Sequence, residues 1–153
     1  MITLQEGKKA PAFSGTDQNG NKVSLKDFKG QKVILYFYPK DDTPTCTIQA
    51  CNLRDNYSDL HKLGFAVIGI SIDTVKSHKK FEQKYQLPFL LIADEDKSIV
   101  EKYGVWGEKK FMGRTFMGTI RTTFLIDETG KIKKIITKAD TKNHSKQVLD
   151  FWN

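Results

Sequence analysis

The stretch Lys32-Val-Ile-Leu-Tyr-Phe-Tyr38 is a short apolar run in which β-branched and aromatic residues predominate. Such a run, ended by Pro39, is typical of a strand that is buried on both faces of a sheet. The following residues, Asp41-Asp-Thr-Pro44, supply N-cap side chains and then a proline suited to the first turn of a helix. We therefore predict a central strand that leads directly into a helix running through Cys46 toward Leu60.

The same alternation continues along the chain. Phe65–Ser71 is a second strand of the buried type, and Asp73 is a plausible N-cap for a helix over 75–85. The remaining patterns predict a strand over 89–92, a helix over 97–103, strands over 121–126 and 131–137, and an amphipathic helix from 143. We expect Gly104–Gly118 to be the one long irregular connection, and long ordered loops often carry function.

Strands that alternate with helices indicate parallel crossover units, whereas the last two strands form an antiparallel hairpin across the turn Asp127–Gly130. The predicted fold class is an α/β, thioredoxin-like sandwich, in which a central mixed β-sheet has helices on both faces. A chain of 153 residues is long enough for one well-buried core, so we expect a single domain over 1–153.

Composition excludes several classes of protein. The residues from Met1 to Phe13 hold no apolar stretch of signal-peptide length, and no apolar run is long enough to span a bilayer, so we expect a cytoplasmic protein without a membrane partner. The net charge is +7, but the lysines are scattered in pairs and no nucleic-acid recognition motif accompanies them. We therefore expect no nucleic-acid partner.

The chain has two cysteines, Cys46 and Cys51. Without a secretion signal a reducing compartment is expected, where paired cysteines tend to be redox-active or metal-binding. A tetrahedral metal site needs further ligands, and His61, His78 and His144 are widely separated and expected at the surface. We therefore predict redox chemistry with no metal and no cofactor.

The two cysteines occupy different places in the predicted helix. Cys46 lies near its first turn, where the helix dipole and free backbone N–H groups favour a thiolate, which is the nucleophilic form. Cys51 lies deeper, where burial opposes ionisation. On a regular helix their Cα atoms are about 8.6 Å apart, which exceeds the usual 4.4–6.8 Å span of a disulfide. A Cys46–Cys51 bond therefore requires the helix start to unwind.

The segment Pro39-Lys-Asp-Asp-Thr-Pro-Thr-Cys46 resembles the active-site signature of the peroxiredoxins. With Cys51 in the same helix, the chain is similar to the Q-type branch, also called the bacterioferritin comigratory protein group. Further segments resemble that group in the same order and extend the resemblance over nearly the whole chain: 69–71, 91–96, 104–108, 111–113 and 121–127.

The resemblance implies a division of roles. The Cys46 thiolate would attack a hydroperoxide and become a sulfenic acid, and Cys51 would condense with it to an intramolecular disulfide. The Thr43 hydroxyl would bind the peroxide, Arg121 would stabilise the thiolate and the leaving oxygen, and Pro39 would shape and shield the pocket. The residues alone permit an inward Arg121, because strand alternation places it on one face with Thr123 and Leu125.

Pro44 and Thr45 would complete this substrate pocket. Thr45 departs from the glycine that is more usual in the motif, and its β-branched side chain is expected to narrow the pocket. The implied partners are a hydroperoxide substrate and thioredoxin or a similar dithiol reductant, and the implied state is a monomer rather than a dimer.

Two other functions remain open from the residues themselves. One is a redox-gated binding module or holdase, in which the cysteines only control the exposure of apolar surface. The other is a dithiol reductase of protein disulfides, which the Cys46–Cys51 spacing disfavours because such enzymes use Cys-X-X-Cys.

Overall fold

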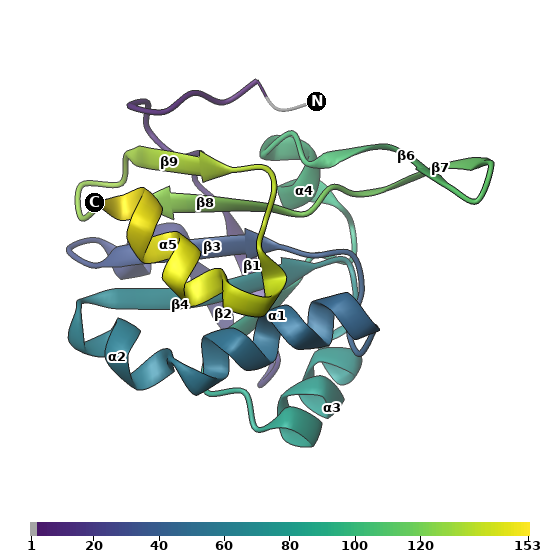
Figure 1. The fold of residues 1–153 in the computed structure, drawn as a ribbon, viewed down its shortest axis with the longest axis horizontal. Helices are drawn as coiled ribbons and strands as arrows, with labels where there is room; N and C mark the ends of the chain where they lie inside the picture. Colours follow the sequence, from purple (N-terminus) through teal and green to yellow (C-terminus); the bar gives the residue numbers. More distant parts are fainter. Residues whose placement is uncertain (1–2) are drawn as a thin grey trace.

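The computed structural model describes residues 3–153. A seven-stranded sheet with the order β2-β1-β5-β4-β3-β8-β9 forms the centre, and β6 and β7 form a separate two-stranded sheet (Figure 1). The strands are β1 (Ser14–Asp17), β2 (Lys22–Ser24), β3 (Lys32–Phe37), β4 (Phe65–Ser71), β5 (Leu90–Ala93), β6 (Trp106–Phe111), β7 (Arg114–Thr119), β8 (Thr122–Ile126) and β9 (Ile132–Ile136). The helices are α1 (Pro44–Asp55), α2 (Tyr57–Lys62), α3 (Val75–Tyr85), α4 (Ser98–Lys102) and α5 (His144–Trp152), with short 3-10 turns η1 (Leu25–Phe28) and η2 (Thr141–Asn143).

Strand β3 lies in the middle of the sheet because both of its faces are apolar. Its alternate residues enter two separate cores: Leu35 packs with residues of α4, and Ile34 packs with residues of α1, α2, α3 and α5. Each core is a contiguous apolar cluster, so helices cover both faces of the sheet.

The sheet is mixed, as predicted. Strands β3, β4 and β5 run parallel to one another, whereas β8 pairs antiparallel with β3 and with β9. The thioredoxin-like α/β fold class is thus confirmed. Strands β1 and β2 were not predicted; they are only four and three residues long and too short for a periodic signal.

The prediction of an irregular segment over Gly104–Gly118 was wrong. Strands β6 and β7 form a regular antiparallel hairpin, in which Phe111 pairs with Arg114 and only Met112 and Gly113 make the turn. Both turn residues have positive φ, at 50° and 77°, as tight hairpin turns require. Methionine is unusual at such a position, and this removed the turn signal from the sequence. The hairpin projects from the body of the protein (Figure 1).

Two smaller predictions also need correction. The helix predicted to continue toward Leu60 is interrupted at Asn56, whose φ and ψ of −110° and 9° separate α1 from α2. The N-cap of α3 is Thr74, whose side chain accepts a hydrogen bond from Ser77 N, and not Asp73. Within residues 3–153 no helix is long and apolar enough to cross a membrane.

Candidate active site

Cys46 lies in the first turn of α1, directly after the loop that follows the central strand. Pro44 opens the helix because its missing N–H is not needed there. The Cys46 side chain is turned inward and is 2% exposed, and the thiols of Cys46 and Cys51 are both free. The fold therefore places one thiol at a helix start, shielded from bulk water.

Arg121 precedes β8 on the strand beside β3 and reaches this thiol. Its Nη2 donates a hydrogen bond to Cys46 Sγ at 3.2 Å. The predicted alternation holds, because Thr123 bonds to His144 and Leu125 enters the core that also contains Cys46. A guanidinium at this distance stabilises a sulfur anion by direct charge-assisted hydrogen bonding.

Gln49 is a site residue that sequence reasoning missed. Its Oε1 accepts a hydrogen bond from Arg121 Nη1 at 2.7 Å, and the side chain is fully buried. Cys46 and Gln49 are three residues apart and so share one helix face. One arginine therefore bridges both residues, and Gln49 fixes the plane of its guanidinium. Spacing from Cys46 is the signal that could have found it.

The remaining predicted pocket residues surround the helix start. The Thr43 hydroxyl donates to the Lys40 carbonyl at 2.9 Å, so its oxygen lone pairs stay open to a donor. Thr43 is the N-cap residue by position, although its side chain does not bond to a helix N–H. Pro39 is half-buried, whereas Pro44 and Thr45 are exposed.

Cys51 lies in the same helix as Cys46 but in a different environment. It is half-buried, and burial raises the pKa of its thiol, with Arg54 acting in the opposite direction. The prediction that Cys51 is the more deeply buried cysteine was wrong, because Cys46 is buried and Cys51 is only half-buried. Because α1 is continuous from Pro44 to Asp55, the ideal-helix separation of about 8.6 Å applies to their Cα atoms.

A buried hydrogen-bond network holds the loop that precedes Cys46. Asp41 Oδ1 accepts from the Tyr38 hydroxyl at 2.6 Å, and Asp41 Oδ2 accepts from the Ser77 hydroxyl at 2.8 Å. His78 Nδ1 lies 2.7 Å from the same Oδ2, and His78 Nε2 donates to the Ile92 carbonyl at 3.0 Å. Because a carbonyl only accepts, Nε2 is a donor, and the His78 ring links Asp41 to the Ile92 carbonyl of β5.

Both buried histidines correct the prediction of surface positions. His78 and His144 are fully buried, whereas His61 is exposed as expected. Asp41, Asp73 and His78 bring their ligand atoms within 4.8 Å of one another. Hydrogen bonds within the protein already use these atoms, since Asp73 Oδ2 accepts from the Asp41 backbone N–H.

Lys109 on β6 also belongs to the surroundings of Cys46. Its Nζ donates to the Thr119 carbonyl at 2.9 Å. Burial lowers the pKa of Lys109, the Arg121 charge lowers it further, and Cys46 acts in the opposite direction. This residue could not be recognised from the sequence because its position depends on the unpredicted hairpin.

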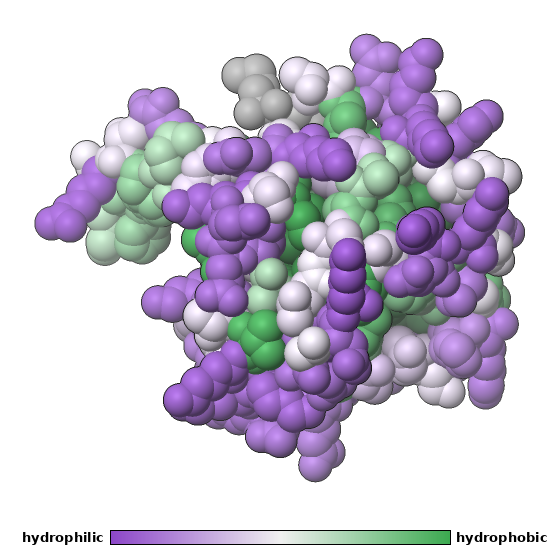
Figure 2. Space-filling model, turned by 180° about the vertical axis from the view of Figure 1, so that it is seen from behind, coloured by the Kyte–Doolittle hydropathy of each residue, from purple (hydrophilic) through white to green (hydrophobic). Residues whose placement is uncertain are grey.

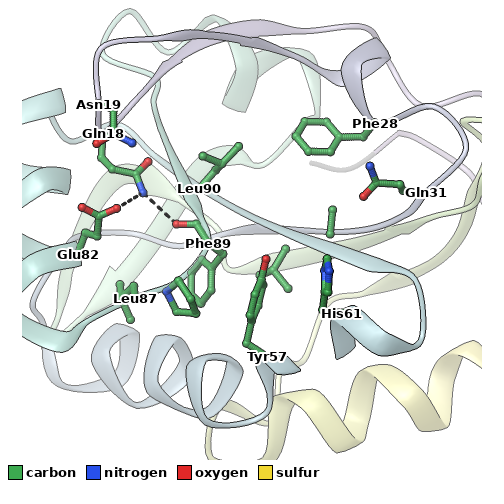
Figure 3. Close-up of a pocket in the computed structure, with 13 residues that line it drawn as sticks. Gln18, Asn19, Phe28, Gln31, Tyr57, His61, Glu82, Leu87, Phe89 and Leu90 are labelled. Atoms are coloured by element: carbon green, nitrogen blue, oxygen red, sulfur yellow. Dashed lines mark hydrogen bonds between the residues drawn. The ribbon is translucent and has the colours of Figure 1, made fainter. Parts of the chain in front are cut away.

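A cavity of about 430 Å³ lies elsewhere in the molecule (Figure 3). Tyr57, His61, Phe89 and Leu90 line it together with residues near the start of β4. The cavity lies near the first residues of β4, whereas Cys46 comes after the last residue of β3, which runs parallel to β4. The cavity and the thiol are therefore at opposite ends of these strands.

The sequence and the fold agree with one family of known proteins. Residues 6–135 match the model of the AhpC/TSA family. The chain is 49% identical to peroxiredoxin Bcp of Escherichia coli (strain K12) over 151 residues, which is 99% of this chain and 97% of that protein. It is 41% identical to peroxiredoxin Bcp of Bacillus subtilis (strain 168) over 148 residues, 97% of this chain and 94% of that protein.

Solved structures show the same relationship. Peroxiredoxin Q of Xylella fastidiosa superimposes with a TM-score of 0.91 at 27% identity, covering 98% of this chain and 96% of that one. The bacterioferritin comigratory protein of Xanthomonas campestris, studied for alkyl peroxide reduction, gives a TM-score of 0.87 at 29% identity, covering 95% and 96%. The chain therefore belongs to the AhpC/TSA family, in the Q-type or bacterioferritin comigratory protein branch of the peroxiredoxins.

Proposed function

We propose that this protein is a thiol peroxidase that reduces hydrogen peroxide and organic hydroperoxides with Cys46 as the nucleophile. The observation that carries the proposal is the 3.2 Å hydrogen bond from Arg121 Nη2 to the buried Cys46 Sγ. The guanidinium donates to the sulfur and lies where it can stabilise the negative charge that develops on the leaving oxygen when the O–O bond breaks. Membership of the peroxiredoxins supports the same chemistry.

The first step uses the residues around the helix start. The Cys46 sulfur attacks the terminal peroxide oxygen, the O–O bond breaks, and the products are a Cys46 sulfenic acid and an alcohol or water. The Thr43 hydroxyl oxygen accepts a hydrogen bond from the peroxide, and Pro39, Pro44 and Thr45 border its entry.

The second step forms a disulfide between Cys46 and Cys51. Condensation of the Cys51 thiol with the sulfenic acid releases water, and it requires the first turns of α1 to unwind because the cysteines are too far apart in the helix. A dithiol protein of the thioredoxin type then reduces the disulfide by thiol exchange. We propose that one cytoplasmic, monomeric domain carries the whole cycle without a cofactor.

Single cysteine variants test the proposal. Cys46→Ser should abolish peroxide consumption in the presence of dithiothreitol, while circular dichroism shows an unchanged fold. Cys51→Ser should still react once and accumulate a sulfenic acid that dimedone labels at Cys46. Peroxide consumption by Cys46→Ser at the rate of the unaltered protein would contradict the proposal.

A further inference from the structure

The hairpin β6–β7 carries several cationic side chains, of which Lys109 is partly buried while others are exposed to solvent. Lys109 is half-buried, whereas the neighbouring Lys110 and Arg114 are exposed. Adjacent side chains of a strand point to opposite faces, so Lys109 and Lys110 cannot both face the thiol. Phe111 and Met117 are also exposed, at 66% and 55%, and Figure 2 shows pale green, apolar atoms beside hydrophilic ones on the projecting hairpin.

A glycine on the partner strand makes room for the Lys109 side chain. A Cβ atom added to Gly118 would lie 3.0 Å from Lys109 Cδ, which is closer than ordinary packing. The aliphatic stem therefore crosses β7 where it has no side chain, and Nζ reaches the carbonyl of Thr119. This carbonyl is two residues before Arg121, and the Arg121 charge acts on the pKa of Lys109.

In the described part of the chain, the Lys109 ammonium has N–H groups that form no hydrogen bond to the protein. An ammonium has three N–H groups, and within residues 3–153 only the hydrogen bond to Thr119 is formed by Lys109 Nζ. Arg121 and Cys46 both act on the pKa of Lys109, so the three groups share one electrostatic environment. Burial and Arg121 together lower that pKa, which makes the ammonium a better acid than a solvated lysine.

The reaction of the proposed function needs a proton donor. The sulfur supplies two electrons to the terminal peroxide oxygen and binds it as Cys46–SOH, while the O–O electron pair leaves as an alkoxide or hydroxide that must take up a proton. Arginine does not release protons in proteins. The buried Tyr36 hydroxyl feels the same charges, but burial raises its pKa well above 10.0, so its proton is harder to transfer.

We propose that Lys109 is a further catalytic residue, which gives its proton to the alkoxide or hydroxide oxygen that leaves when the O–O bond breaks. The ammonium becomes a neutral amine as the alkoxide becomes an alcohol, and the amine then recovers a proton from water. Arg121 stabilises the negative charge and Lys109 removes it. This inference rests on the proposed peroxidase function and adds a role that the Cys46 motif does not contain.

The test compares leaving groups in stopped-flow measurements of the second-order rate constant. Lys109→Met keeps the apolar stem and should react about 10²-fold more slowly with cumene hydroperoxide, because its leaving alkoxide needs a proton. The same variant should react with peracetic acid at nearly the rate of the unaltered protein, because acetate leaves without protonation. Lys110→Met, which removes an exposed cation from the same strand, is the matched control and should change neither rate.

Each other outcome counts against the assignment. Equal slowing with both oxidants would mean that Lys109 only supports the structure or the thiolate, and no slowing would remove it from the reaction. Equal effects of Lys109→Met and Lys110→Met would indicate a general effect of charge. If the unaltered protein reacts with neither oxidant, the proposed peroxidase function itself fails, which distinguishes that failure from failure of the Lys109 assignment.

Discussion

Arg121 is the side chain on which the reactivity of Cys46 depends most directly. It donates to Cys46 Sγ through one nitrogen and to Gln49 Oε1 through another. Arg121→Met removes both hydrogen bonds and should lower the second-order rate constant with hydrogen peroxide by about 10²–10³-fold.

Arg121→Lys is the matched variant, and it should recover only part of this rate. A lysine restores the charge but cannot hold sulfur and amide in one planar fork. Stopped-flow kinetics of the two variants checks the prediction. Full activity of Arg121→Met would show that the thiolate does not need this cation.

His144 makes stability depend on pH. It lies in the core between Thr123 Oγ1 and Gln147 Oε1, each at 2.9 Å, and burial lowers its pKa from 6.5 to about 4, with the Gln147 hydrogen bond acting in the opposite direction. Between pH 6.5 and pH 4, His144 is protonated in the unfolded chain but remains neutral in the folded protein. Stability is therefore complete above pH 6.5 and declines below it, by at most about 3 kcal/mol from this group.

Urea denaturation at several pH values checks this prediction. The free energy of unfolding should fall between about pH 6.5 and pH 4. Replacing His144 by Asn should make that fall smaller, because the group that titrates has been removed. An identical decline in both proteins would assign the pH dependence to other groups.

At the level of elements, α3 holds the loop between β3 and α1. His78 and Ser77 bind Asp41, while Lys84 Nζ and the Tyr85 hydroxyl each bind Asp42 at 2.7 Å. Asp42 has a φ of 57°, an unusual conformation that these contacts help to maintain. The loop that carries Thr43 toward Cys46 is thus anchored by a neighbouring helix.

Removing His78 should therefore destabilise the protein strongly. His78→Ala removes a buried hydrogen-bond partner of Asp41, which typically costs about 1–3 kcal/mol. His61→Ala is the control, because His61 is exposed, and it should change the free energy of unfolding by no more than about 0.5 kcal/mol. Similar values for both variants in urea denaturation would contradict the importance of the buried pair.

Unwinding on oxidation should be confined to residues 44–51 of α1. The last turn is fixed, because Asn52 bonds to Lys142 O and Ser145 N, and Arg54 Nη1 bonds to Tyr85 O. Hydrogen exchange should therefore accelerate over 44–51 after peroxide treatment and remain slow over 52–55. Unchanged protection over 44–51 in a protein with a Cys46–Cys51 disulfide would show that the bond forms without unwinding.

For the molecule as a whole, the sequence predicted what local patterns determine. Strand β3, helix α1 and the places of Cys46, Cys51 and Thr43 follow from apolar runs, capping residues and one contiguous motif. Strand alternation permitted an inward Arg121, and the resemblance to the peroxiredoxins implied it. These features depend on residues that are close together in the chain.

The features that were missed depend on residues that are distant in the chain. Gln49 acquires its role only when β8 brings Arg121 to α1, and Lys109 only when the β6–β7 hairpin forms over a turn without the usual Asn-Gly signal. His78 and His144 become acceptable in the core because their hydrogen-bond partners come from other elements. The positions of these residues depend on tertiary contacts, which local patterns in a single sequence do not reveal.

The most direct test of the account follows the sulfur of Cys46 itself. Cys51→Ser protein should be mixed with one equivalent of hydrogen peroxide, trapped with dimedone and mapped by mass spectrometry, alongside the unaltered protein. We expect a dimedone adduct at Cys46 in the variant and a Cys46–Cys51 disulfide in the unaltered protein. An unmodified Cys46 in folded protein under excess peroxide would contradict it.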